Sequence, residues 1–166
     1  MLGHSSFKVL VVEQFADHPG CRSSGRAVRA AADTLGRLGH SVTAGAMPVS
    51  MDALSDFWGV ISKVGLASLR DAVPAMRDKA GPQYLEMAEE GARVSAGTFW
   101  AGLETVQKFR SDVSRAFAEW DLIMTPSCPA QPWPAGLAYP TSIDGKPGGP
   151  RRHPIYAVWV NAWGHP

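Results

Sequence analysis

The sequence has 166 residues, of which 45% are hydrophobic and 19% are charged, and its formal net charge is +1. This length suits one globular domain with a sizeable core, and the scattered basic residues argue against a nucleic-acid-binding protein. Cys21 and Cys128 are too few and too far apart for a disulfide framework, and no apolar run approaches the about 20 residues of a membrane span. Because the N-terminus also lacks a signal-peptide pattern, we expect a soluble, cytoplasmic protein that does not enter a membrane.

Residues 1–6 are polar, and we expect them to be disordered, with residues 7–166 forming one α/β domain. Phe7–Val12 follows as a continuous run that is rich in β-branched residues. Such a run is typical of an internal strand that is covered on both faces.

The next elements predict a strand–helix–strand unit. Apolar residues from Ala27 to Leu38 recur at helical spacing, and Ser23 or Ser24 is placed to cap this helix. Gly39 suits the left-handed position after the helix, and residues 41–44 predict a second strand. Because short loops join these elements, the two strands should be parallel neighbours.

The middle of the chain predicts three helices. Ser50 can cap the first, which must end before Pro74, and the second covers about Gln83 to Ala92. Ser95 can cap a long amphipathic helix that we expect to continue to Trp120. Its apolar face consists of Phe99, Leu103, Val106, Phe109, Val113, Phe117 and Trp120.

The last third predicts two more strands around a loop. Asp121–Thr125 reads as a short buried strand, and residues 126–149 are a loop rich in proline and glycine. Ile155–Trp163 is apolar enough to be a strand. The predicted fold class is therefore α/β, with a partial mixed or parallel sheet and packed helices.

A search for catalytic chemistry finds no complete set of groups. Ser23-Ser24-Gly25 could form a nucleophile turn, but a helix cap is the better interpretation because no glycine cluster offers free amides there. Cys128 lies at the end of a predicted strand, where α/β sheets hold ligands, yet no neighbouring base is visible, so a structural thiol is favoured. The histidines and cysteines match no metal-binding spacing, and nothing indicates a cofactor.

Four segments, taken in order, resemble the C-terminal half of amidase-signature hydrolases. They are Lys8–Glu13, Ala27–His40, Trp120–Pro126 and Asn161–Pro166. In that family the last three correspond to stretches that read like "alGHeV", "yDvllTPttp" and "N.tGlPA". The resemblance covers nearly the whole chain and implies part of the larger amidase-signature fold.

The resemblance implies hydrolysis of a carboxamide C–N bond by a Ser–cis-Ser–Lys triad. In the family, the lysine and the glycine- and serine-rich segment lie upstream of the equivalent of Phe7, and neither Lys63 nor Ser23-Ser24 matches them in order or surroundings. We therefore expect a truncated piece of an amidase that has no catalytic residue and is inactive alone.

By the same resemblance, this half of the enzyme lines part of the substrate pocket, and an apolar or aryl amide would suit its tryptophans. The residues expected in that role are Thr125, Pro126, Cys128, Trp133, Asn161 and Gly164.

Two further expectations stay open. The chain could instead be a non-catalytic α/β module that binds a small ligand at the loop after Met124. A truncated sheet would also expose Val9–Val12 or Leu122–Met124 as an edge, so we expect self-association, in which the long helix could be swapped.

Overall fold

A computed structural model describes residues 6–15, 18, 20–150 and 152–164. The expected disorder of residues 1–5 and the end of the Asn161–Pro166 motif lie outside these ranges. No helix within the described residues has the length and apolar character needed to cross a bilayer.

The chain is organised as two compact units, one made of Met1–Ser50 and Arg110–Pro166, the other of Met51–Phe109. The prediction of a single domain over residues 7–166 stays a prediction. Unit 1 holds the strands β1 (Lys8–Val11), β2 (Ser41–Ala44), β3 (Leu122–Met124), β4 (Ser142–Ile143) and β5 (Lys146–Pro147), with the helices α1 (Arg22–Arg37) and α6 (Ile155–Trp163). Unit 2 holds α2 (Asp52–Ala72), α3 (Met76–Lys79) and α4 (Pro82–Ala92), and α5 (Ala96–Ala116) runs from unit 2 into unit 1.

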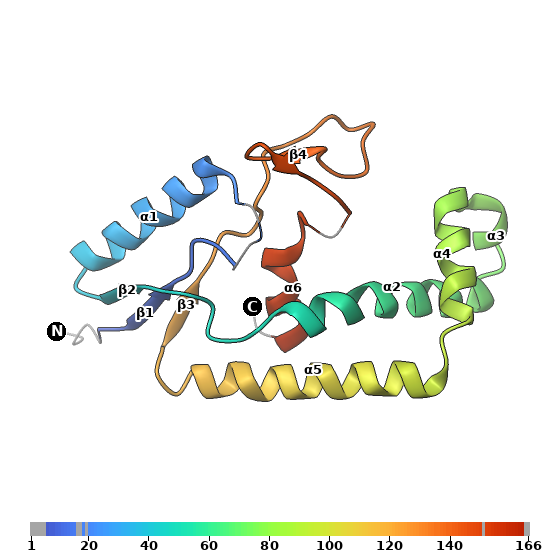
Figure 1. Ribbon diagram of the computed structural model, residues 1–166, viewed down its shortest axis with the longest axis horizontal. Coiled ribbons are helices and arrows are strands. Elements are labelled where there is room, and N and C mark those ends of the chain that lie inside the picture. The colour runs from blue at the N-terminus through green and yellow to red at the C-terminus, as the bar shows by residue number, and fades with distance from the viewer. Residues whose placement is uncertain (1–5, 16–17, 19, 151, 165–166) are drawn as a thin grey trace. The chain divides into compact units, whose positions relative to one another are not determined.

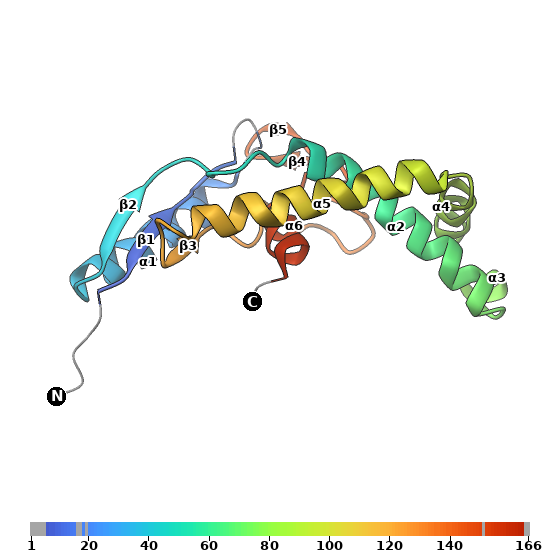
Figure 2. The same cartoon turned by 90° about the horizontal axis from the view of Figure 1, so that it is seen from below.

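A three-stranded parallel sheet of order β2-β1-β3 forms the centre of unit 1 (Figure 1). Val9 pairs with Val42 on one side and with Leu122 on the other. The predicted β1–α1–β2 unit with parallel, neighbouring strands is therefore confirmed. Figure 2 shows the three strands side by side, with α1 running along them.

The core of this sheet forms where α1 meets β1. Val28, Ala32 and Leu35 of α1 are spaced by three or four residues and pack against Val9 and Val11. All the apolar residues from 9 to 12 are at most 4% exposed, as expected for an internal strand.

The end of α1 also follows the sequence pattern. Gly39 has a φ of +92°, and the His40 N–H donates to the Leu35 carbonyl, which ends the helix in the left-handed way expected of glycine. The chain then enters β2, and the Phe7 N–H donates to Nδ1 of His40 at 3.3 Å.

The strand predicted at residues 121–125 is present as β3, but the prediction that it is buried is wrong. β3 lies at one edge of the sheet, so Leu122 is 44% exposed and Ile123 and Met124 are only half-buried. Of the two segments expected as an exposed edge, Leu122–Met124 is an edge strand, whereas Val9–Val12 lies in the centre of unit 1's sheet and is buried.

The predicted strand at Ile155–Trp163 is also wrong, because this segment forms the helix α6. A short run that is apolar throughout has no clear period, so the sequence alone does not separate a strand from a buried helix. Gly164, with a φ of +88°, ends α6 in the left-handed conformation. The buried side chains follow a helical period: Ile155, Tyr156, Val158, Trp159 and Ala162.

The proline-rich segment 126–149 is more than a loop, since it contains the hairpin β4–β5. Asp144 and Gly145 form its two-residue turn, and both have positive φ values of 49° and 79°. Asp-Gly is the pair that such a turn favours, and this signal was overlooked in the sequence.

The long helix α5 starts as predicted but ends early. The Ser95 hydroxyl accepts the N–H of Thr98 at 3.0 Å and so caps the helix. The helix ends at Ala116 instead of Trp120, and Asp121 then donates its N–H to the Lys8 carbonyl as the chain enters β3.

Unit 2 is built on close packing of α2 against α4. A Cβ atom at Gly91 of α4 would overlap the Lys63 carbonyl of α2, so glycine is required for this approach. Gly102 of α5 likewise makes room for the ring of Phe57. The first residue of α2 is Asp52, and its N-cap is Met51 instead of the predicted Ser50.

Candidate functional site

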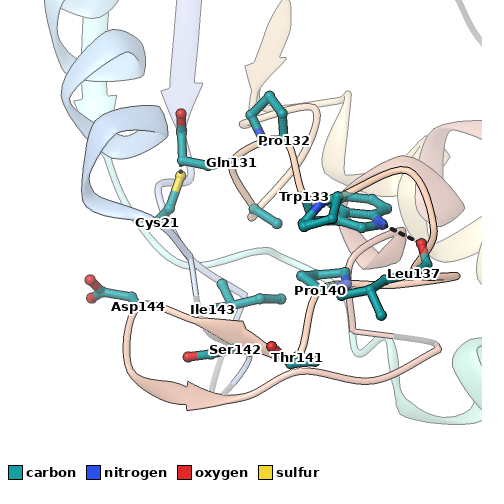
Figure 3. Close-up of a pocket in the computed structure, with 12 residues that line it drawn as sticks. Cys21, Gln131, Pro132, Trp133, Leu137, Pro140, Thr141, Ser142, Ile143 and Asp144 are labelled. Carbon is teal, nitrogen blue, oxygen red and sulfur yellow. Dashed lines mark hydrogen bonds between the residues drawn. The ribbon is translucent and has the colours of Figure 1, made fainter.

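The first hollow in unit 1, which we call the loop pocket, lies between the start of α1 and the proline-rich segment (Figure 3). Its volume is about 240 Å³. It is lined by Cys21, residues 130–134, Leu137 and residues 140–144.

Cys21 is the N-cap residue of α1, and its side chain is held by polar neighbours from two segments. Its Sγ lies 3.3 Å from the Ser23 hydroxyl and 2.9 Å from the Ser24 hydroxyl. From the opposite side, Nε2 of Gln131 donates to Sγ at 3.3 Å and to the Ser23 hydroxyl at 2.6 Å. Figure 3 shows the sulfur directed toward Gln131.

These contacts favour the thiolate form of Cys21. Burial raises the pKa of the thiol, but hydrogen bonds from Ser23, Ser24 and Gln131 and from the Ser24 backbone outweigh it. The net result lowers the pKa from 9.0 to about 7. Sequence reasoning missed this residue, because Gln131 lies 110 positions away and only the fold brings it to the sulfur.

The cap predicted for α1 is consequently wrong. Helix α1 begins at Arg22, so Ser23 and Ser24 lie inside its first turn, and their side chains contact Cys21 instead of the backbone. Among the described residues, the hydrogen bonds of these serines include no lysine or histidine, so neither has a base that would make it a nucleophile.

The second hollow, which we call the α6 groove, lies between α6 and β3 and has a volume of about 970 Å³. It is lined by Val9, Leu35, Ser114, Phe117, residues 121–125, Ser127, residues 156–157, residues 159–161 and Trp163. Trp163 stacks on Phe117 with a centroid distance of 4.6 Å, and Nε of Arg110 donates to the Ala162 carbonyl at 2.7 Å. The end of α5 and α6 are thereby joined at one side of the groove.

Tyr156 connects the base of α6 to the chain that follows β1. Its ring stacks on Phe15 with a centroid distance of 4.3 Å, and its hydroxyl accepts the Phe15 N–H at 3.4 Å. Burial raises the pKa of this phenol and the charge of Cys21 raises it further, which outweighs the opposing effect of the Phe15 hydrogen bond.

The six residues expected to line a substrate pocket fall in different places. Thr125 and Asn161 both line the α6 groove, whereas Trp133 lines the loop pocket. Nε1 of Trp133 donates to the Leu137 carbonyl at 2.9 Å, and its ring meets His153 edge-on at 5.1 Å.

The other three line neither hollow. Pro126 is buried, and Cys128 is half-buried with its Sγ 3.9 Å from the His153 carbonyl. Gly164 ends α6. Within the described residues, no group of three or more histidine, cysteine, aspartate or glutamate side chains is placed to hold a metal ion.

No protein-family model matches the sequence, and no curated protein matches it. Solved structures do match its fold, and they are amidase signature enzymes: the fold described above is part of that larger α/β fold. One is a bacterial aryl acylamidase of the amidase signature family, with a TM-score of 0.77 and 19% sequence identity over 97% of this chain. Another is 6-aminohexanoate cyclic dimer hydrolase, with a TM-score of 0.81 and 22% sequence identity. The structure of that hydrolase in complex with its substrate matches with a TM-score of 0.78 and 21% sequence identity.

The chain spans only 36% of the aryl acylamidase and 37% of the cyclic dimer hydrolase. The structural likeness therefore concerns a part of those enzymes, as the ordered sequence motifs had suggested.

Proposed function

We propose that this chain is part of an amidase-like hydrolase that cleaves a carboxamide C–N bond, and that it lacks the Ser–cis-Ser–Lys triad and is inactive alone. The observation that carries the proposal is the match of 97% of this chain to only 36–37% of the amidase signature enzymes. Within the part of the chain that the structure describes, no base is hydrogen-bonded to Ser23 or Ser24, which supports the second half of the proposal because an unactivated hydroxyl is a weak nucleophile.

The role we propose for the chain is to line part of the substrate pocket. Thr125 and Asn161 line the α6 groove beside Trp163, and Trp133 lines the loop pocket, so both hollows place an indole ring beside polar groups. Aromatic rings with a few polar groups suit the binding of an apolar or aryl amide. Pro126, Cys128 and Gly164 would act by shaping the surrounding backbone.

The test is an amide-hydrolysis assay on the purified chain, with an anilide as substrate. We expect no hydrolysis above the buffer rate. Turnover that is lost in Ser24→Ala, but kept in the matched helical control Ser62→Ala, would reveal a local nucleophile and contradict the proposal.

The pocket role has a separate test in a chimera. In it, this chain replaces the matched segment of the bacterial aryl acylamidase. Trp133→Ala should then raise KM for the anilide with a smaller change in kcat, since uniform binding is what a pocket wall supplies. An unchanged KM would remove Trp133 from the pocket.

A second candidate function is a non-catalytic module that binds a small ligand after Met124. The loop pocket favours it, because residues 130–134 and 140–144 of the segment after Met124 line this hollow. A thermal-shift screen of the lone chain separates the two candidates. A ligand at about 100 times its Kd would stabilise the fold by roughly 2.7 kcal/mol, which favours the module.

Two further proposals concern the chain's surroundings. The exposed edge of β3 supports self-association of the lone chain, which light scattering at rising concentration would detect and a monodisperse monomer would contradict. The free thiols of Cys21 and Cys128 support a reducing, cytoplasmic location.

A further inference from the structure

The loop pocket places a thiol beside an apolar lining. The lining includes Ile143, which is 2% exposed, the half-buried indole of Trp133 and the side chain of Leu137, which is 43% exposed. Cys21 lines the same hollow, and Figure 3 shows it there together with the indole. Ligand sites are typically concave and apolar, with a few polar or reactive groups that fix the ligand. The arrangement therefore suits a ligand that packs on the apolar lining and reacts with the thiol.

Volume and charge narrow the class of ligand. Drug-sized ligands fill pockets of about 300–1,000 Å³, whereas a cavity of about 150 Å³ already holds benzene. The loop pocket, at about 240 Å³, thus has room for one aromatic ring with a short side chain, and the indole of Trp133 favours such a ring. Asp144 also lines the hollow, but Nε of Arg22 lies 3.5 Å from its Oδ1 and offsets its charge. The ligand that fits best is therefore small, aromatic and neutral.

The groups around Cys21 favour negative charge at the sulfur and beside it. Nε2 of Gln131 lies 3.3 Å from Sγ and 2.6 Å from the Ser23 hydroxyl, so an amide donor is fixed at this point. Cys21 is also the N-cap of α1, a helix of 16 residues that has no acidic side chain in its first turn. The positive end of the helix dipole therefore lies next to the sulfur. An anion that forms within reach of these groups is stabilised by them.

We propose that the loop pocket is a covalent binding site for a small, neutral, aromatic α,β-unsaturated carbonyl compound, whose ring packs on Trp133 and whose β-carbon bonds to Cys21. In this step the Sγ lone pair forms the bond to the β-carbon, the C=C π bond breaks, and its electron pair passes to the carbonyl oxygen as an enolate. Water then gives a proton to the α-carbon. No oxidant is consumed and no group leaves, and Gln131 is close enough to Sγ to donate to the enolate oxygen.

This inference goes beyond the amidase role, because the adduct forms without the Ser–cis-Ser–Lys triad. It rests on the second candidate function, the ligand-binding module, and names the class of ligand for it. A reactive thiol without a pocket would add to aromatic and aliphatic reagents at the same rate. A preference for the aromatic reagent is therefore the quantity that the experiment measures.

The probes are N-benzylacrylamide and N-ethylacrylamide, which react alike in solution because both carry a CH2 group on the amide nitrogen. Peptide mass spectrometry of the whole chain gives the rates at Cys21 and at Cys128, which lies outside the pocket and is the internal reference. We expect Cys21 to add the benzyl probe about tenfold faster than the ethyl probe, and Cys128 to add both equally. The benzyl rate at Cys21 should also saturate with concentration, because binding in the pocket precedes addition.

Substitutions of the ring partner localise the preference. Trp133→Ala should reduce the preference at Cys21 from about tenfold to about twofold, whereas Trp133→Phe keeps an aromatic ring and should retain most of it. Trp100→Ala, which removes a 65% exposed indole on α5, is the matched control and should change nothing. The ethyl rate at Cys21 should stay constant in all three variants, since the contacts of the sulfur with Gln131, Ser23 and Ser24 remain.

Three results would overturn the proposal: equal rates of the two probes at Cys21, a preference that Trp133→Ala leaves intact, or a benzyl rate that never saturates. The saturated analogue N-benzylpropanamide distinguishes this failure from failure of the module. If it raises the melting temperature and protects Cys21 from iodoacetamide while the two acrylamides react equally, the module stands and the covalent step is wrong. If it does neither, the module fails as well. Anilide hydrolysis by the chimera tests the amidase role independently of both.

Discussion

The loop pocket and the α6 groove are both hollows of unit 1, yet they differ in how complete they are. The loop pocket is small, about 240 Å³, and its polar side chains satisfy one another around Cys21. The α6 groove is about 970 Å³ and consists mainly of apolar side chains from a strand edge and a helix. This contrast indicates that polar contacts within the chain hold the first hollow together, whereas the second keeps an open apolar surface.

The largest difference in the free energy of unfolding should lie between substitutions of two tryptophans, one beside each hollow. Trp159→Ala should lower the free energy of unfolding by about 3–5 kcal/mol, because a 4% exposed ring is removed from the core of α6. Trp133→Ala should cost no more than about 2 kcal/mol, because this ring is half-buried and makes one hydrogen bond. Urea denaturation followed by circular dichroism measures both, and equal losses would contradict the contrast.

The second prediction concerns the reactivity of the loop pocket. With a pKa of about 7, about half of the Cys21 thiols are ionised at pH 7, against about 1% for a pKa of 9.0. Alkylation of Cys21 should therefore rise with pH to a half-point near 7 and fall about tenfold for each unit below it.

Iodoacetamide labelling with peptide mass spectrometry gives this profile for Cys21 directly. Ser24→Ala removes one hydrogen bond to the sulfur and should move the half-point to higher pH, whereas Ser114→Ala, away from the pocket, should not. A half-point near 9 in the unaltered chain would mean that the polar contacts are absent in solution.

A smaller effect is expected at the base of α6. Tyr156→Phe removes the hydroxyl that accepts the Phe15 N–H and should lower the free energy of unfolding by about 1 kcal/mol. Tyr139→Phe is the matched control on a 39% exposed ring and should change it by less than about 0.5 kcal/mol. A Tyr156→Phe variant as stable as the control would show that this hydrogen bond is not formed.

The smallest effect should come from the ion pair at the rim of the loop pocket. Nε of Arg22 lies 3.5 Å from Oδ1 of Asp144, but the arginine side chain is 82% exposed. Arg22→Ala should thus change stability by less than about 0.5 kcal/mol, because water and salt screen such pairs. A loss above 1 kcal/mol in the same urea assay would show that the rim is less solvated than the structure indicates.

Local patterns were sufficient for the elements whose signals lie within a few residues. Val9–Val12, the apolar stripe of α1 and Gly39 together predicted a parallel strand–helix–strand unit, and Ser95 predicted the start of α5. These features depend on side-chain periodicity and backbone conformation within a few residues, which is information that the sequence carries directly.

Tertiary structure decided those features that depend on contacts between residues distant in sequence. Ile155–Trp163 is apolar throughout, so its burial against the rest of unit 1 made it a helix, and the edge position of β3 left Leu122 exposed. The same holds for the candidate site, where Gln131 reaches Cys21 across 110 positions. Sequence by itself determined the local elements and the family resemblance. Only the folded chain decided that β3 is an edge strand and that the pKa of the Cys21 thiol is lowered, because strand pairing and solvation are properties of the assembled surroundings.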